Sequence, residues 1–126
     1  MNNDTVLLRQ IHPSFVQQGR ETSQAFRPTP KDEHKLSMYD GDQISAERSF
    51  QHYTGRLSLA SMGVLGATVI ECQDLDLLVV PDPHPFNEHV LIDYSAFDKN
   101  VVEKKAKLLK AKAETRGWHF RDSSTF

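Results

Sequence analysis

Two histidines, two acids and three prolines lie within residues 81–89, near the middle of the second half of the chain. His84 and His89, with Asp82 and Glu88, have side chains of the kinds that bind zinc or iron. The alternating prolines fix φ and remove backbone donors, so they predict a stiff exposed connector and exclude a helix that would align the histidines. His84 and His89 are therefore candidate metal ligands only with a third ligand from elsewhere. Surface histidines in a proline loop are the simpler interpretation, and no metal is expected.

A second candidate site combines Arg9, His12, Ser23 and His89. We expect Arg9 and Ser23 to lie on the first two paired strands and His89 to begin a later strand. An arginine can hold phosphate bidentately, a serine can orient a ribose, and a histidine can act as acid or base. In an enzyme, Arg9, Ser23 and His89 would be catalytic, with His12 added to the ligand-binding set. The alternative is that Arg9 pairs with an acidic loop while Ser23 and His89 cap strand ends.

Apolar and alternating patterns predict the elements that would position these side chains. Predicted strands cover 5–11, 21–26, 36–39, 63–70, 77–80, 89–94 and an edge strand at 118–120, with one helical turn at 71–76. The paired glycines Gly63 and Gly66 indicate close approach by another backbone or side chain.

Two helices are predicted. The first covers 46–54, with Ser45 as N-cap and Gly55 as C-cap; the second begins at Asn100, in a pattern like a capping box, and ends at Gly117. Buried residues of the second follow the i, i+4, i+7 spacing of one apolar stripe. The fold class is α+β: a small mixed sheet of five or six short strands with two helices, in a single compact domain, 1–126, whose residues 121–126 fray.

Charge is segregated along the 126 residues, although the net charge is only −2. No Lys or Arg occurs between Leu57 and Asp98, whereas the segment from Lys99 onward is rich in lysine. We expect the acidic middle and the basic C-terminal helix to attract each other within the fold. The lysine face lacks interleaved aromatic residues, so we do not expect a nucleic-acid partner.

The single cysteine, Cys72, excludes a disulfide within one chain and favours a reducing cytoplasm. The polar start is not a signal peptide, and no apolar run approaches the roughly 20 residues that span a bilayer. These features predict a cytoplasmic protein without a membrane association.

Several short motifs, in their order along the chain, resemble a group of small uncharacterised bacterial proteins. Those proteins carry an Arg-x-x-Pro-like start, a Ser-x-x-Phe-like segment, a Leu-Ser-Val-like segment and a late Asp-Pro followed by His and a strand. The corresponding residues here are Arg9-x-x-His12-Pro13, Thr22-Ser23-Gln24-Ala25-Phe26, Leu36-Ser37-Met38-Tyr39, Asp82-Pro83 and His89-Val90-Leu91-Ile92. The resemblance covers most of the chain and implies a bacterial protein, but no activity.

The layout is also similar to ADP-ribosyltransferase-like folds, in which an Arg on the first strand grips NAD and a Ser motif shapes the nicotinamide pocket. This resemblance implies those roles for Arg9 and Ser23. The family's catalytic Glu falls on His89 here, with Glu88 one residue earlier and facing the other side of a strand. A binding-only relative of the family would tolerate that departure.

Three functions follow from the sequence. The leading hypothesis is a small intracellular interaction or accessory module that has a protein partner, no cofactor and no chemistry of its own. The second is an NAD-binding enzyme of the ADP-ribosyltransferase-like class, and the third is a metal-dependent hydrolase centred on His84 and His89. Substrate, partner identity and oligomeric state are left open.

Overall fold

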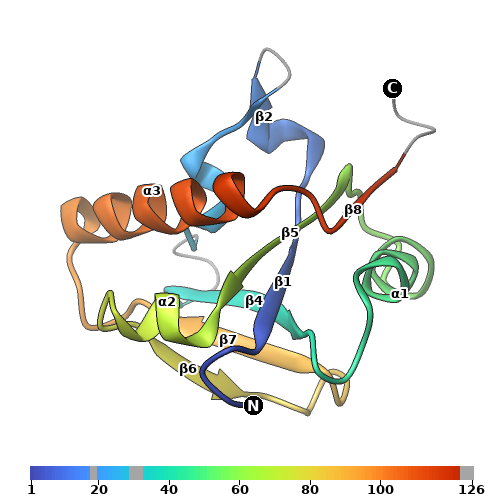
Figure 1. Ribbon diagram of the computed structural model, residues 1–126, viewed down its shortest axis with the longest axis horizontal. Coiled ribbons are helices and arrows are strands. Elements are labelled where there is room, and N and C mark those ends of the chain that lie inside the picture. The colour runs from blue at the N-terminus through green and yellow to red at the C-terminus, as the bar shows by residue number, and fades with distance from the viewer. Residues whose placement is uncertain (18–19, 29–32, 123–126) are drawn as a thin grey trace.

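The computed structural model describes residues 1–17, 20–28 and 33–122, and it confirms the α+β class (Figure 1). The elements, in chain order, are β1 (Val6–Gln10), η1 (Pro13–Phe15), β2 (Val16–Gln17), β3 (Arg20–Glu21), η2 (Ser23–Phe26), β4 (Lys35–Asp40), α1 (Ala46–Gln51), η4 (His52–Arg56), β5 (Gly63–Thr68), α2 (Val69–Gln73), β6 (Leu78–Pro81), β7 (His89–Asp93), α3 (Lys99–Arg116) and β8 (Phe120–Arg121).

Within the described residues, six strands form one sheet in the order β6-β7-β4-β1-β5-β8, and β2 pairs with β3 in a separate ribbon. Every pair is antiparallel. The prediction of a mixed sheet was therefore wrong. A parallel pair needs a crossover between neighbouring strands that run in the same direction. Here α3 connects β7 to β8, which are separated in the strand order by β4, β1 and β5.

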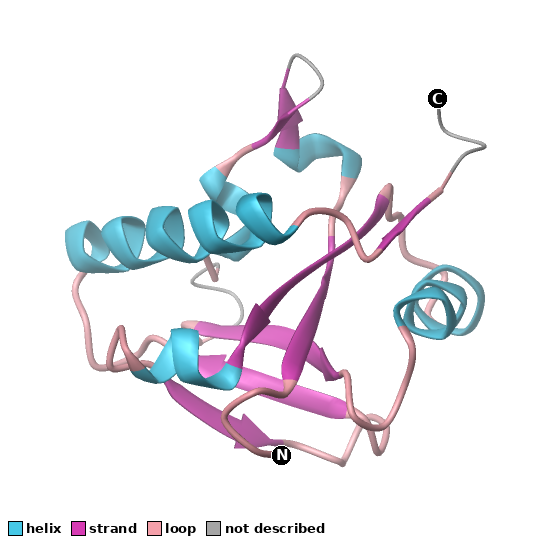
Figure 2. Ribbon diagram, in the orientation of Figure 1, coloured by secondary structure: helices cyan, strands magenta, loops and turns pink. Residues whose placement is uncertain are grey.

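The sheet divides between β1 and β4. β1 pairs with β5 along its whole length but with β4 only at Leu7↔Asp40 and Leu8↔Tyr39. Figure 2 shows the result: β4, β7 and β6 lie together, and β1 and β5 rise away from them. The part of β4 that precedes Tyr39 therefore lacks a strand neighbour on the β1 side.

The two faces of β1 are buried by different helices, which lie on opposite sides of β1 and β5 in Figure 1. Leu7 faces the larger core, together with the predicted α3 stripe of Val102, Ala106, Leu109 and Ala113. Leu8 faces a smaller core with Tyr39, against which Phe50 of α1 packs. Full burial of a leucine such as Leu109 contributes roughly 1.5–3 kcal/mol, so the stripe holds α3 to the sheet.

Segment 21–26 is not the predicted strand beside β1. Residues Ser23–Phe26 form the 3-10 helix η2, and Arg20–Glu21 pair with Val16–Gln17 instead. The backbone N–H of Thr22 donates to the Phe15 carbonyl at 2.8 Å, which turns the chain. Ala25 and Phe26 are adjacent and both fully buried, a pattern that a tight helical turn allows and a half-exposed strand does not.

Two helix ends differ from their prediction. The N-cap of α3 is Asp98, not Asn100, because the Asp98 carboxylate accepts the Val101 N–H at 3.0 Å. The first helix begins after Ser45 as predicted, but it continues past Gly55 as the π-helix η4 rather than ending there.

Pro81 was predicted to lie in the exposed connector, outside the sheet. It is the last residue of the edge strand β6, where a missing backbone donor is tolerated.

The C-terminal strand extends further than the predicted edge strand and reaches part of the segment that was expected to fray. Arg121 belongs to β8, and the Asp122 N–H donates to the Met62 carbonyl at 3.0 Å. The prediction that the chain frays from residue 121 was therefore wrong for Arg121 and Asp122, because the end of β8 is hydrogen-bonded to the residue just before β5. Residues 123–126 lie outside the described residues.

Close packing at the β5 glycines is confirmed. A Cβ on Gly63 would meet the Phe120 carbonyl oxygen at 2.5 Å, and one on Gly66 would meet Val6 and His119 side chains below 3 Å. Gly55, in η4, has no atom within 4 Å of such a Cβ.

We predict that Gly63→Ala lowers the free energy of unfolding by about 1–3 kcal/mol, because β8 must shift to admit the methyl group. Gly55→Ala is the control and should leave stability unchanged or raise it, since alanine favours helical backbone. Urea denaturation of both variants measures the difference. Equal stabilities would contradict the packing of β8 on β5.

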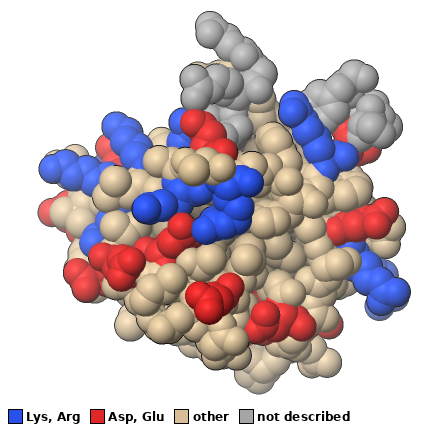
Figure 3. Space-filling model, in the orientation of Figure 1, with Lys and Arg blue, Asp and Glu red and all other residues tan. Residues whose placement is uncertain are grey.

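The predicted attraction between the acidic middle and the basic helix occurs at Glu71. Arg116 of α3 donates to Glu71 Oε2 at 2.9 Å and to the Gly66 carbonyl at 2.9 Å. Lys105 of the same helix donates to the Leu75 carbonyl. Figure 3 shows Lys and Arg side chains along α3 with Asp and Glu side chains just below them. Burial raises the pKa of Glu71, but the hydrogen bonds from Arg116 and Thr68 outweigh it and hold that pKa below the usual value.

Because the folded pKa of Glu71 is depressed, its ionised form stabilises the fold. That contribution is complete above the unfolded value of about 4.5 and is lost as the pH falls through the lower folded pKa. We predict that Glu71→Gln destabilises the protein by about 0.5–1 kcal/mol at pH 7 and by much less under strongly acidic conditions. Urea midpoints across pH, with the exposed Glu47→Gln as control, measure this. If Glu71→Gln lowered the free energy of unfolding equally at every pH, the charge of Glu71 would not be the source of the stabilisation.

Candidate active site

A cleft of about 290 Å³ opens on the face of the sheet that carries α1 and η4. Its polar lining comes from three strands of the sheet: Arg9 and Gln10 of β1, Ser37 of β4 and His89 of β7. Its apolar walls are formed by aromatic and aliphatic side chains, namely Leu36, Met38, Tyr39, Tyr53, Leu57, Leu59 and Phe86.

Ser37, His89 and Asp82 are connected across three neighbouring segments: His89 is hydrogen-bonded to the Ser37 hydroxyl and to the Asp82 carbonyl, and its Nδ1 also lies within ion-pair distance of the Asp82 carboxylate. The His89 Nε2 lies 3.1 Å from Ser37 Oγ, and its Nδ1 lies 3.2 Å from Asp82 Oδ2 and 3.0 Å from the Asp82 carbonyl oxygen. Ser37 is exposed, whereas His89 is 7% exposed. The order carboxylate, imidazole, hydroxyl is that of a serine-hydrolase triad.

The antiparallel register creates this order. Tyr39 pairs directly with His89, so Ser37, two residues earlier on β4, is the diagonal neighbour on the same face. On the other side, Pro81 pairs with Val90, and the Asp82 N–H donates to the His89 carbonyl at 2.9 Å. The hairpin between β6 and β7 therefore places Asp82 opposite His89.

The hydrogen-bond partners of His89 determine its tautomer. The Asp82 carbonyl oxygen and the Asp82 carboxylate oxygen Oδ2 can only accept a hydrogen bond, so the proton of the neutral His89 imidazole is on Nδ1. The Nε2 atom is then the acceptor, and the Ser37 hydroxyl donates to it. This is the tautomer in which a histidine can take a proton from a serine.

Aromatic side chains cover the imidazole. Phe86 packs edge-on to His89 at 5.0 Å between ring centroids and stacks on Tyr39 at 5.0 Å. The Tyr39 hydroxyl lies 2.7 Å from His52 Nδ1, which η4 supplies. Burial, with smaller effects of Tyr53 and Glu88, raises the pKa of Tyr39, so this hydroxyl stays protonated at neutral pH. The continuation of the helix through η4 thus contributes to the wall of the cleft.

Arg9 occupies the division between β1 and β4. Its Nε donates to the Ala25 carbonyl at 2.8 Å and its terminal NH1 to the Ser37 carbonyl at 2.9 Å. The guanidinium therefore substitutes for the strand neighbour that β4 lacks. It also places a fixed positive charge beside Ser37, and no Asp or Glu is among the described residues that line the cleft.

The structure brings together two of the four residues predicted as a site, Arg9 and His89. Ser23 lies in η2 and is not among the described residues that line the cleft, because the segment is not a strand beside β1. His12 caps η1, where its Nδ1 accepts the Ser14 N–H at 3.0 Å, and it does not line the cleft either.

For the metal candidates, His84 is exposed in the turn between β6 and β7, while His89 is engaged with Ser37 and Asp82. Among the described residues, no group of three or more His, Cys, Asp or Glu side chains is arranged to hold a metal ion. Cys72 is buried, and that burial, with a smaller effect of Glu71, raises its pKa to about 12, so its thiolate is not available as a nucleophile at neutral pH.

Sequence reasoning missed Ser37 because it lies within the ordinary strand β4, without the sharp Gly-x-Ser-x-Gly turn that marks many serine nucleophiles. Asp82 was considered only as a metal ligand. The sequence signal that could have placed Asp82 beside His89 was the spacing of the hairpin, in which prolines flank Asp82 and a strand begins at His89.

Comparison with family models, curated proteins and solved structures found no match to this chain. Among the described residues, no helix is both long and apolar enough to cross a membrane.

We predict that Arg9→Gln lowers the free energy of unfolding by about 2–3 kcal/mol, because the Ser37 and Ala25 carbonyls lose a charged donor. Arg48→Gln, on the exposed surface of α1, is the control and should change stability by less than about 0.5 kcal/mol. Urea denaturation compares the two. A loss no larger than that of Arg48→Gln would contradict a structural role of Arg9 at the division of the sheet.

Proposed function

We propose that this protein is a small serine hydrolase that cleaves esters or related acyl compounds, with Ser37 as nucleophile, His89 as general base and Asp82 as the residue that orients His89. The observation that carries the proposal is the continuous series from Asp82 Oδ2 through His89 to Ser37 Oγ, with distances of 3.2 and 3.1 Å. A buried imidazole in the required tautomer, next to an exposed hydroxyl, supports it.

In the proposed reaction, Ser37 Oγ attacks the acyl carbon while its proton moves to His89 Nε2. That proton then passes to the leaving alkoxide as the ester bond breaks, which leaves an acyl group on Ser37. Water, deprotonated by His89, hydrolyses the acyl group and restores the serine. The positive charge of Arg9 beside the Ser37 backbone favours the negative charge that develops on the acyl oxygen.

The cleft favours a short apolar acyl group. Leu57 and Leu59 on its rim are 39% and 48% exposed, and Tyr53 and Phe86 form its walls. A volume of about 290 Å³ is at the lower end of small-molecule sites, so the substrate is a small ester rather than a polymer.

The hypothesis of an interaction module remains a second candidate, and a specific surface supports it. β6 is an edge strand whose Leu78 and Val80 are 64% and 42% exposed. An exposed apolar edge can accept a strand from a protein partner. The expectations of NAD binding and a cytoplasmic location also remain predictions.

The test is turnover of 4-nitrophenyl acetate and 4-nitrophenyl butyrate, together with covalent labelling by a fluorophosphonate. The proposal predicts one label, on Ser37, formed as Ser37 Oγ bonds to phosphorus and fluoride leaves. Ser37→Ala and His89→Gln should abolish labelling and reduce turnover at least about 1000-fold, and Asp82→Asn should reduce turnover strongly because the tautomer is no longer fixed.

Ser14→Ala is the matched control. Ser14 is also an exposed serine within hydrogen-bond distance of a histidine, at 2.8 Å from His12 Nδ1, but it is outside the cleft. It should keep full activity. Turnover that survives Ser37→Ala, or a label on Ser14, would refute the proposal; a wild-type protein that neither turns over nor reacts would favour the interaction module.

A further inference from the structure

A second, larger cavity of about 810 Å³ lies between η2 and the first turn of α3, with Arg9 on its β1 side. This cavity is distinct from the proposed triad, because its described lining residues do not include Ser37, His89 or Asp82. Its volume is within the range of sites that hold small organic ligands.

Positive charge predominates in this cavity. Among the described lining residues, Arg9, Arg27 and Lys99 are basic and Glu103 is acidic, and Glu103 Oε1 accepts from Arg27 at 3.2 Å. The Arg27–Glu103 pair is close to neutral, so the positive charge of Lys99 is the one that this pair does not offset. His34 also lines the cavity with its imidazole.

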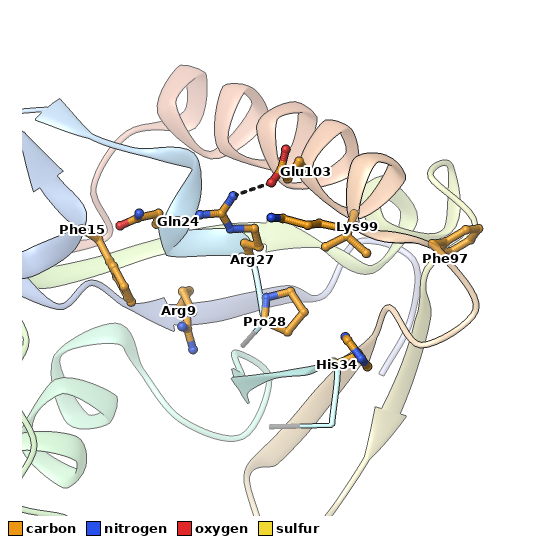
Figure 4. Close-up of a pocket in the computed structure, with 10 residues that line it drawn as sticks. Arg9, Phe15, Gln24, Arg27, Pro28, His34, Phe97, Lys99 and Glu103 are labelled. Carbon is orange, nitrogen blue, oxygen red and sulfur yellow. Dashed lines mark hydrogen bonds and ion pairs between the residues drawn. The ribbon is translucent and has the colours of Figure 1, made fainter. Parts of the chain in front are cut away.

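Lys99 is the cation that is available to a ligand. It is exposed at the start of α3 and has no hydrogen-bond or ion-pair partner among the described residues. In Figure 4, Lys99 extends from α3 toward Arg27, which lies in the segment after η2 and whose guanidinium is joined to Glu103. An anion placed between Lys99 and Arg27 would satisfy both without breaking the structure.

Apart from Gln24, the rest of the described lining is apolar. Phe15, Pro28, Phe97 and Val102 contribute rings and methyl groups, and Pro28 and Val102 are buried. A cavity with cations at one end and apolar groups along its walls is suited to an amphipathic anion more than to an inorganic one.

We propose that this cavity binds a small organic anion, with a carboxylate or phosphate between Lys99 and Arg27 and an aromatic or aliphatic body against Phe15 and Phe97. Because Arg9 borders both this cavity and the cleft, the two sites share one rigid side chain. The proposal does not depend on the hydrolase activity.

The test is an NMR titration of the whole protein with phenyl phosphate, benzoate, benzyl alcohol and inorganic phosphate. Saturable shifts are expected at the amides of Gln24, Arg27 and Lys99 with phenyl phosphate or benzoate. Affinity should be at least about tenfold weaker for benzyl alcohol, which lacks the negative charge, and for inorganic phosphate, which lacks the aromatic body. The stronger of the two aromatic anions identifies the preferred acidic group.

Lys99→Gln should weaken binding of the preferred anion about five- to tenfold, because it removes the exposed cation without breaking a contact. Lys107→Gln, on the same helix but outside the cavity, is the control and should bind as the wild type does. Gln24→Trp tests the location independently, since an indole at this exposed lining position should block the cavity while all charges remain.

Ser37→Ala should bind the anion unchanged, which separates this site from the proposed hydrolase. Equal weakening in Lys99→Gln and Lys107→Gln, binding of benzyl alcohol as tight as that of phenyl phosphate, full binding by Gln24→Trp, or no saturable shifts at millimolar concentrations would each overturn the proposal.

Discussion

The arrangement of the sheet depends on the guanidinium of Arg9. β1 leaves β4 after two paired residues, and without a substitute the Ser37 carbonyl would lose its donor on that side. Arg9 supplies this donor and, through Nε, also holds the Ala25 carbonyl of η2. A lysine carries all its donors on one nitrogen and lacks the rigid planar group that holds Nε and NH1 of Arg9 at separate positions. One side chain thus ties together β1, β4 and η2, and both cavities border it.

The division of the sheet has a consequence for the cleft. Where β1 and β4 stay paired, their side chains pack in the smaller core with Leu8 and Tyr39. Where they separate, there is room beside Ser37, and the aromatic cluster of Tyr39 and Phe86 borders that space without filling it. A fully paired sheet would bring the next β1 residues against β4 and reduce the space beside the serine.

The proline connector has a narrower and more specific role than a loop of metal ligands. It closes the hairpin between β6 and β7, and the backbone bond from Asp82 to His89 fixes its width. Restricted φ angles at Pro81 and Pro83 lower the entropy that ordering Asp82 costs. Phe86, from the same turn, shields the imidazole from water. A stiff connector is what a carboxylate needs if it is to keep one orientation toward a neighbouring strand.

The sequence by itself determined the α+β class, most strand positions, the buried stripe of α3 and the close approach at Gly63, because these follow from local periodicity and side-chain size. It also indicated Arg9 and His89 as polar residues on strands. It misplaced Ser23, since adjacent apolar residues such as Ala25 and Phe26 fit a strand or a tight helix equally well until their partners are known. Only the tertiary structure decided that Asp82, His89 and Ser37 lie together. Strand register depends on pairing between segments that are distant in the sequence, and no local pattern specifies which strand becomes the neighbour.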